Sequence, residues 1–215
     1  YVDKTALIHR LVSTGGYYFF GRPRRFGKSL MISTLESYFE GRKDLFLGLA
    51  IESLEKDWDE YPIFHIDLNN EEYNSRKRLE GVLNNYLVRW ERIYGSEPSE
   101  ESLSLRFAGL IRRASEQTGR GVVILIDEYD KPLIQSLDNE ELQSEYQSIL
   151  KSFYGNLKSC DKYIRFALLT GVTRFSRVSI FSDLNNLNDI TMNPDFASLC
   201  GISEKELVEF FDEDV

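Results

Sequence analysis

The run Val122–Ile126 is the most apolar stretch of the chain, and it constrains the fold more than any other feature. The run is rich in β-branched residues and ends abruptly at Asp127-Glu128. A strand with one face in water would alternate apolar and polar residues, whereas a continuous apolar run is typical of a strand buried on both faces of a parallel sheet. We therefore predict an α/β protein with helices on both faces of its sheet.

Strand-like runs alternate with stretches of helical periodicity along the rest of the chain, as expected for a largely parallel sheet. The expected strands are 17–20, 63–68, 122–126, 164–169 and 187–191. The expected helices are 3–12, 29–40, 75–94, 100–117, 139–158 and 203–211. The last of these helices has a capping signature, because Glu206 follows Ser203 by three residues.

With 215 residues, the chain is long enough for one large domain with a sizeable core. We expect a main domain over residues 1–200 and the start of a truncated helical region over residues 201–215. The opening Tyr1–Lys4 has no basic and then apolar leader, so we expect a piece trimmed from a longer protein. No apolar stretch approaches the roughly 20 residues that span a membrane, so we expect no membrane segment.

The net charge and the small numbers of cysteines and histidines limit the classes of protein to which this chain can belong. The formal charge of −9 disfavours nonspecific nucleic-acid binding, and Arg76–Arg78 is better explained as a solvated helix face. Cys160 and Cys200 lack metal-ligand spacing, so we expect two reduced, mostly buried thiols and a cytoplasmic location; a disulfide is the alternative. His65 lies in an apolar run and is expected to be a core-edge histidine.

The segment Gly21–Ser29 lies between an expected strand and an expected helix. A nucleoside triphosphate needs converging peptide N–H groups, a helix N-terminus, an ammonium group and a hydroxyl for a metal ion. Gly27 would let the backbone approach closely, Lys28 would reach the β- and γ-phosphates, and Ser29 would ligate Mg²⁺. The residues expected to bind the nucleotide are Arg22, Arg24, Arg25, Phe26, Gly27, Lys28, Ser29 and Leu30.

This segment differs from the usual phosphate-binding loop. The usual spacing puts a first glycine five residues before Gly27, where this chain has Arg22, and Gly21 comes one residue early. Pro23 also removes a backbone donor. The preceding strand, the following helix and the neighbouring arginines nevertheless favour a phosphate site. We expect the arginines to add phosphate contacts; a solvated turn is the alternative.

Two acidic residues follow the most apolar strand. A magnesium-bound nucleotide needs a carboxylate near the metal, and Asp127 suits that role. Hydrolysis also needs a group that orients or deprotonates the attacking water, and Glu128 is placed to do so. Acidic residues often end strands for other reasons, but this pair follows a buried strand about a hundred residues after a Gly-Lys-Ser loop. The combination predicts a catalytic site.

A third candidate element follows the strand 164–169. Thr170 is the candidate sensor of the γ-phosphate, and Arg174 would contribute positive charge; for each residue an ordinary turn at a strand end is the alternative. No Asn/Thr-Lys-x-Asp motif for guanine follows the acidic strand. ATP is therefore favoured over GTP by elimination.

Four sequence strings together resemble the bacterial AAA-ATPase-like family. They are Tyr-Val-Asp-Lys-Thr (1–5), Arg-Pro-Arg-Arg-Phe-Gly-Lys-Ser (22–29), Ile-Asp-Glu-Tyr-Asp-Lys-Pro (126–132) and Leu-Thr-Gly-Val-Thr-Arg-Phe (169–175). The resemblance runs over essentially the whole chain, and the family itself has arginine at the position of Arg22. It implies a P-loop NTPase three-layer sandwich with a mostly parallel five-stranded sheet of order 5-1-4-3-2, helical insertions and a catalytic glutamate.

Members of this family often carry a C-terminal domain similar to PD-(D/E)xK nucleases. This chain contains no Glu-x-Lys or Asp-x-Lys triplet, so a nuclease-like domain is expected outside it. The leading hypothesis is a Mg²⁺-dependent ATPase domain whose turnover drives or gates such an effector. Lys28, Thr170, Arg174 and Glu128 would then act in catalysis, and Ser29 and Asp127 would hold the metal.

The sequence is also compatible with three alternative hypotheses about function. The first is a nucleotide-dependent switch that binds ATP and hydrolyses it slowly until a homo-oligomer supplies a missing arginine. The second is a small-molecule phosphotransferase, which consecutive Asp127 and Glu128 make less favoured because they suit water activation. The third is a purely structural domain, which would leave three coincident motifs unexplained. Expected partners are ATP and ADP, with no membrane and no nucleic acid for this domain.

Overall fold

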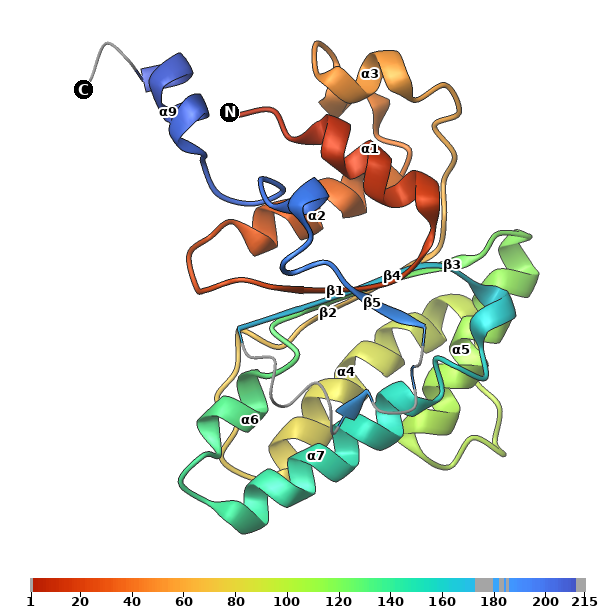
Figure 1. The fold of residues 1–215 in the computed structure, drawn as a ribbon. Helices are drawn as coiled ribbons and strands as arrows, with labels where there is room; N and C mark the ends of the chain where they lie inside the picture. Colours follow the sequence, from red (N-terminus) through yellow and green to blue (C-terminus); the bar gives the residue numbers. More distant parts are fainter. Residues whose placement is uncertain (1, 173–179, 182–183, 185, 212–215) are drawn as a thin grey trace.

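A parallel sheet of five strands forms the centre of the protein (Figure 1). The computed structural model describes residues 2–172, 180–181, 184 and 186–211. The strands are β1 (Gly16–Gly21), β2 (Ile63–Asp67), β3 (Val122–Asp127), β4 (Ile164–Gly171) and β5 (Leu187–Asp189). Their order is β2-β3-β4-β1-β5, and each neighbouring pair is parallel. Read from the other edge, this is the expected order 5-1-4-3-2.

Helices cover both faces of this sheet, so the expected three-layer α/β architecture is confirmed (Figure 1). One face carries α1 (Thr5–Thr14), α2 (Lys28–Phe39) and α3 (Ala50–Leu54). The other face carries α4 (Arg76–Tyr94), α5 (Leu103–Thr118), α6 (Lys131–Gln135) and α7 (Glu140–Gly155). Short 3-10 turns span Lys43–Phe46, Asp161–Tyr163 and Pro194–Phe196, and a final helix, α9, spans Glu204–Phe211.

Strand β3 contributes to two separate hydrophobic cores. Val122, Ile124 and Ile126 pack into the core beneath α4, α5 and α7. Val123 and Leu125 pack into the core beneath α1, α2 and α3. Successive side chains of a strand point to opposite faces, so a sheet with helices on both faces requires apolar residues at every position. This arrangement explains the continuous apolar run.

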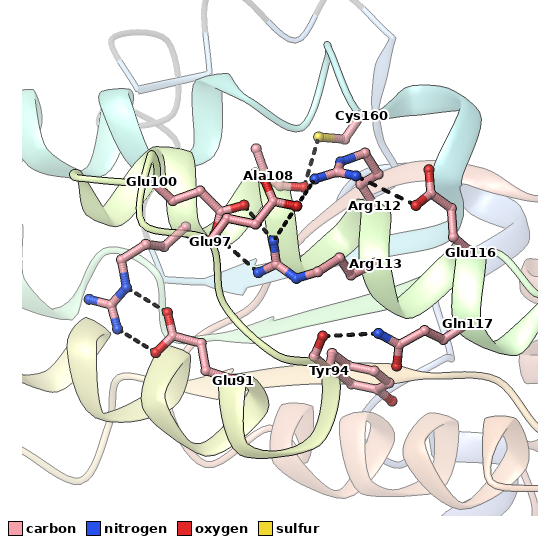
Figure 2. A network of polar contacts seen from close by, with 11 residues as sticks. Glu91, Tyr94, Glu97, Glu100, Ala108, Arg112, Arg113, Glu116, Gln117 and Cys160 are labelled. Atoms are coloured by element: carbon pink, nitrogen blue, oxygen red, sulfur yellow. Dashed lines mark hydrogen bonds and ion pairs between the residues drawn. The ribbon is translucent and has the colours of Figure 1, made fainter.

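Ion pairs link helix α5 to helix α4 and to the connection between these two helices (Figure 2). Arg113 pairs with Glu100 at 3.0 Å between Nη2 and Oε2, and both side chains are nearly buried. Arg106 binds Glu91 through Nε and Nη2. Gly109 lies beneath Glu100, and a Cβ there would collide with its carboxylate. The connection is therefore held against α5 only because that helix has a glycine at this point.

Several smaller expectations are also confirmed. Both cysteines are buried and free of disulfides, and Arg76–Arg78 is exposed on α4. The expected capping box is present, because Ser203 Oγ accepts from Glu206 N while the backbone N–H of Ser203 donates to the Glu206 carboxylate. His65 lies at the core edge, with Nδ1 3.1 Å from Glu36. Within the described ranges, no helix is long and apolar enough to cross a membrane.

Parallel pairing brings the carboxyl ends of the strands to one edge of the sheet. The register aligns Gly21 of β1 with Gly171 of β4, and Asp127 of β3 with Asp67 of β2. In open α/β sheets this edge is where ligands bind, because the loops that follow the strands converge there. The segments that were predicted to carry chemistry therefore meet at one place.

Candidate active site

The loop between β1 and α2 has the backbone of an anion-binding site. Two of its residues have left-handed conformations, Arg25 with φ 65° and Gly27 with φ 83°. Left-handed residues interleaved with ordinary ones are typical of loops in which several peptide N–H groups converge. Helix α2 starts at Lys28, and no side chain of the described chain caps its first turn. The partial positive charge of this helix end is thus directed at the loop.

Lys28 is buried under the loop, with 3% of its surface exposed. Its Nζ donates to the carbonyl oxygens of Arg22 at 2.9 Å and Pro23 at 3.1 Å. It also lies 3.0 Å from Oε1 of Glu128, which is itself buried. A buried ammonium group is stable only when it is paired, so these oxygens hold Lys28 in place.

Asp127 connects the phosphate loop with the tip of β4. Its Oδ2 accepts a hydrogen bond from Ser29 Oγ at 2.7 Å, and its Oδ1 accepts one from Thr170 Oγ1 at 2.5 Å. Asp127 is 2% exposed and Thr170 is fully buried, whereas Ser29 faces solvent. Because Thr170 fixes the carboxylate, Oδ2 is presented toward the serine. Ser29 Oγ and Asp127 Oδ2, two oxygen atoms able to ligate a hard metal ion, therefore lie side by side next to Lys28.

Glu128 has an unusual backbone conformation. Its φ of 53° is in the left-handed region, which a residue other than glycine enters only when its surroundings enforce it. Here the tip of β4 does so: Thr170 O accepts from Tyr129 N at 3.0 Å, and Thr170 Oγ1 lies 3.4 Å from Glu128 N. This conformation directs the Glu128 carboxylate to Lys28 instead of continuing the strand.

The turn after Glu128 is also attached to β4. Asp130 is fully buried and accepts a hydrogen bond from Val172 N at 2.9 Å. A Cβ at Gly171 would lie 2.5 Å from Tyr129 Cε1 and 2.8 Å from Asp130 Oδ1, so only glycine fits between them. The acidic turn and the tip of β4 consequently form one packed unit.

The structure brings together Lys28, Ser29, Asp127, Glu128 and Thr170, as the sequence predicted. The arginines near the loop differ in their exposure and in the groups that they contact. Arg24 and Arg25 are exposed in the loop, where they remain candidates for phosphate contacts. The guanidinium of Arg22 instead contacts backbone carbonyls of the segment after β5. Arg174 lies outside the described residues.

A cavity of about 510 Å³ opens beside the phosphate loop. Three parts of the chain form its walls: the start of the chain with α1, the loop with α2, and the segment after β5. The lining residues are Val2, Lys4, Ile8, Arg25, Phe26, Gly27, Leu30, Met31, Thr34, Leu199, Cys200, Gly201 and Ile202. Phe26 and Leu30, both predicted to bind nucleotide, are large exposed apolar residues at this cavity. Its size and largely apolar lining are typical of small-molecule sites.

Burial raises the pKa of the Cys200 thiol to about 11 in the wall of this cavity. Its Sγ lies 3.8 Å from Met31 Sδ. At neutral pH the thiol is therefore protonated, and Cys200 serves as an apolar wall residue without nucleophilic character.

Sequence reasoning missed three residues of the site. Lys4 lines the cavity, Asp130 holds the tip of β4, and Thr191 Oγ1 accepts a hydrogen bond from Gly21 N at 3.0 Å. Lys4 and Asp130 lie in the strings that carried the family resemblance, so those strings were a signal for them. Thr191 ends the expected fifth strand, but nothing nearby in the sequence indicates that it meets the phosphate loop.

The fold and the arrangement of these residues define a P-loop NTPase domain: a parallel sheet of order 5-1-4-3-2, with a Gly-Lys-Ser loop after β1 and an Asp-Glu pair at the end of β3. More specifically, the chain belongs to the AAA-ATPase-like family described as "Predicted AAA-ATPase", which it matches over residues 1–181. No solved structure matches the chain.

One relative is an "Uncharacterized protein in vnfD 5'region" from Azotobacter chroococcum mcd 1. It is 39% identical to this chain over 212 residues, which is 98% of the chain. The chain spans 41% of the length of that relative. The similarity therefore covers the domain described above.

Proposed function

We propose that this chain binds ATP together with Mg²⁺ and hydrolyses it to ADP and phosphate. The observation that carries the proposal is the junction of Lys28, Ser29, Asp127 and Glu128 at the carboxyl edge of the sheet, where two chain segments about a hundred residues apart meet within hydrogen-bond distance. A structural domain has no need of a buried lysine and two buried carboxylates at one point. Membership of a predicted ATPase family supports the same conclusion.

Lys28 and the start of α2 would hold the phosphates. The ammonium group is already placed at the loop by Arg22 O and Pro23 O, so binding requires only that it exchange the Glu128 carboxylate for a phosphate oxygen. The phosphate brings its own negative charge, which replaces that of the carboxylate. Glu128 is released by the same exchange and becomes available for catalysis.

The pair Ser29 and Asp127 fits a Mg²⁺ site. Magnesium prefers oxygen ligands and is usually bound by one or two protein groups, with waters and substrate phosphates completing its shell. Ser29 Oγ and Asp127 Oδ2 supply such oxygens, and their contact of 2.7 Å shows that both face the same space. When bound, the metal would neutralise charge on the β- and γ-phosphates.

Glu128 would act as the general base. A water oxygen attacks the γ-phosphorus, the bond from that phosphorus to the bridging oxygen breaks, and Glu128 accepts the proton of the water. Thr170 is the candidate for sensing the γ-phosphate, because its hydroxyl contacts Asp127 and lies close to the Glu128 backbone. Arg24, Arg25 and Arg174 would supply further positive charge.

The cavity beside the loop would receive the adenosine part of the substrate. It adjoins the phosphate loop at Arg25, Phe26 and Gly27, as a site for the rest of a nucleotide must. Apolar side chains such as Ile8 and Met31 suit the faces of a purine ring. ATP is preferred to GTP because the chain has no guanine-specific motif.

The proposal can be tested by measuring Mg²⁺-dependent ATP hydrolysis and nucleotide binding for the wild-type chain, Lys28→Ala and Glu128→Gln. Loss of the general base is expected to lower kcat by a factor of about 100 or more. Glu128→Gln should still bind ATP, whereas Lys28→Ala should lose binding. Lys77→Ala and Glu141→Gln, at exposed positions on α4 and α7, are matched controls that should behave as wild type.

The outcomes distinguish the alternatives. Binding without turnover in the wild type would favour a slow nucleotide-dependent switch, or a homo-oligomer in which a neighbouring copy supplies an arginine. Failure of the wild-type chain to bind ATP would contradict the proposal. We further propose that the domain drives or gates a C-terminal effector such as a nuclease-like domain. A boundary near residue 200 and a cytoplasmic location belong to the same proposal.

A further inference from the structure

Arg22 occupies the position at which the usual phosphate-binding loop has its first glycine. Its backbone N–H donates to Gly171 O at 3.1 Å, and its carbonyl oxygen accepts from Lys28. The main chain of Arg22 therefore already belongs to the loop. The side chain makes separate contacts, and these indicate its role.

The guanidinium of Arg22 is bound on three sides. It lies over the ring of Phe20, with 4.6 Å from Cζ to the ring centroid. Nη1 donates to Thr191 O and, at 3.2 Å, to the neighbouring Gly21 O, and Nη2 donates to Ala197 O at 3.3 Å. These contacts orient the side chain toward the segment after β5. A planar guanidinium can lie flat on a ring while two of its edges donate to carbonyls on different sides, a geometry that the compact ammonium group of a lysine does not offer.

The segment held by Arg22 forms one wall of the cavity beside the loop. It begins two residues after β5 with Thr191, whose Oγ1 accepts from Gly21 N, and it includes the carbonyl of Ala197 that accepts from Arg22. It then supplies the wall residues Leu199–Ile202. Thr191 and Ala197 are thus two anchors that fix the segment immediately before it meets the cavity. If these anchors were lost, the wall could move away from the loop.

We propose that Arg22 is a positioning residue for the nucleoside part of the substrate, which holds the 191–202 segment so that Leu199–Ile202 close the purine pocket, and that its guanidinium does not contact phosphate. The inference rests on the proposed function, because the cavity must receive a nucleoside. It also explains why arginine replaces the usual glycine: the residue joins the base of the phosphate loop to the wall of the base pocket.

The test compares two ligands that share their phosphates and differ in the nucleoside. Equilibrium dissociation constants for ATP and inorganic tripolyphosphate, both with Mg²⁺, are measured by calorimetry for the wild-type chain, Arg22→Gln and Arg22→Lys. Arg22→Gln is expected to weaken ATP binding about tenfold, the loss expected for a hydrogen bond from a charged group. Tripolyphosphate binding is expected to stay unchanged. Arg22→Lys should give a smaller loss for ATP alone.

Two further variants complete the design. Thr191→Val removes the acceptor of the Gly21 N–H at the same junction, and it should reproduce the selective loss for ATP even if Arg22→Gln fails to fold. Arg42→Gln removes an exposed arginine that pairs with Asp44, and it should bind both ligands as wild type does.

An equal loss of both ligands in the folded Arg22 variants would overturn the inference, because it would show a phosphate contact. Unchanged ATP binding in the Arg22 and Thr191 variants would overturn it as well. A wild-type chain that binds tripolyphosphate but gains nothing from the nucleoside would overturn this inference alone. A wild-type chain that binds neither ligand would overturn the proposed function together with it.

Discussion

The hydroxyl group of Thr170 contacts two residues of the acidic turn at the same time. The proton of Oγ1 is donated to Asp127 Oδ1, and the oxygen faces the backbone N–H of Glu128. Since Thr170 is fully buried, no water can replace this hydroxyl without a rearrangement of the site. The side chain thus orients the carboxylate that faces Ser29 and supports the left-handed backbone of Glu128. One hydroxyl therefore sets the positions of two acidic residues.

We expect Thr170→Val to lower both stability and activity, because valine has the same shape but leaves a buried carboxylate oxygen without its donor. The free energy of unfolding should fall by about 1–3 kcal/mol. Urea unfolding and ATP turnover are the measurements. Thr170→Ser keeps the hydroxyl and is the matched control, which should retain most of the activity. A valine variant as stable and active as the serine variant would contradict this role for the hydroxyl.

At the scale of single residues, sequence reasoning succeeded where chemistry is carried by neighbours along the chain. Lys28 and Ser29 lie next to a glycine at the start of a helix, and Asp127 and Glu128 end a buried strand, so local patterns indicated these four. The contacts of Arg22 with Thr191 and Ala197 join residues 169 and 175 positions apart. No local pattern signals such contacts, and the phosphate contact predicted for the Arg22 guanidinium gains no support from them.

Helices α4 and α5 each contain an internal glycine, and the two glycines have opposite surroundings. A Cβ at Gly81 in α4 would meet nothing within 4 Å. A Cβ at Gly109 in α5 would collide with Glu100. Glu100 is a partner of Arg113 (Figure 2). Both glycines lower helix propensity by the same amount, so any difference between their alanine variants reports the contact with Glu100.

We predict that Gly81→Ala stabilises the protein by about 0.5–1 kcal/mol, the usual gain for a helical glycine with free space above it. Gly109→Ala should instead destabilise it by about 1–3 kcal/mol, because Glu100 must move and leave Arg113 nearly buried without its partner. Chemical denaturation of both variants measures the difference. Two variants that shift stability in the same direction would show that the Glu100 contact has little weight.

At the scale of elements, all five strands and six of the helices lie where the sequence patterns predicted them, with ends that differ by a few residues. The patterns did not predict α3 and α6, each of five residues. Helix α3 is capped from afar, because Asp3 accepts from Ala50 N and Thr5 Oγ1 accepts from Ile51 N. A helix that depends on side chains 46 and 47 residues away has no signal of its own in the sequence.

At the scale of the whole molecule, the two ends of the described chain meet. Lys4, just before α1, forms an ion pair with Glu206 of α9, which lies beside the start of the chain (Figure 1). The hydrogen bond from Lys4 holds the pKa of Glu206 at about 2, below the usual 4.5. A lowered pKa means that the contact stabilises the attachment of α9 above about pH 4.5. This stabilisation is lost as the pH falls from there toward 2.

We expect Glu206→Gln to speed amide hydrogen exchange in α9 at pH 6. The factor should not exceed about fivefold, because partly exposed ion pairs contribute about 1 kcal/mol at most. Glu204→Gln, in the same helix, should exchange as wild type does. The wild type should approach the Glu206→Gln rate at pH 3, after correction for intrinsic exchange. Equal exchange in Glu206→Gln and wild type at pH 6 would show that the ion pair does not hold α9.

Strand β1 carries the phosphate loop, yet its two neighbours in the sheet, β4 and β5, lie far behind it in the chain. A nascent chain that grows from its N-terminus has completed β1 by Gly21 but has no partner for it until β4 (Ile164–Gly171) has been made. At about 5–20 residues per second this interval lasts on the order of ten seconds. Throughout that time an apolar, aromatic strand has both edges unpaired, which leaves it open to pairing with other chains during synthesis.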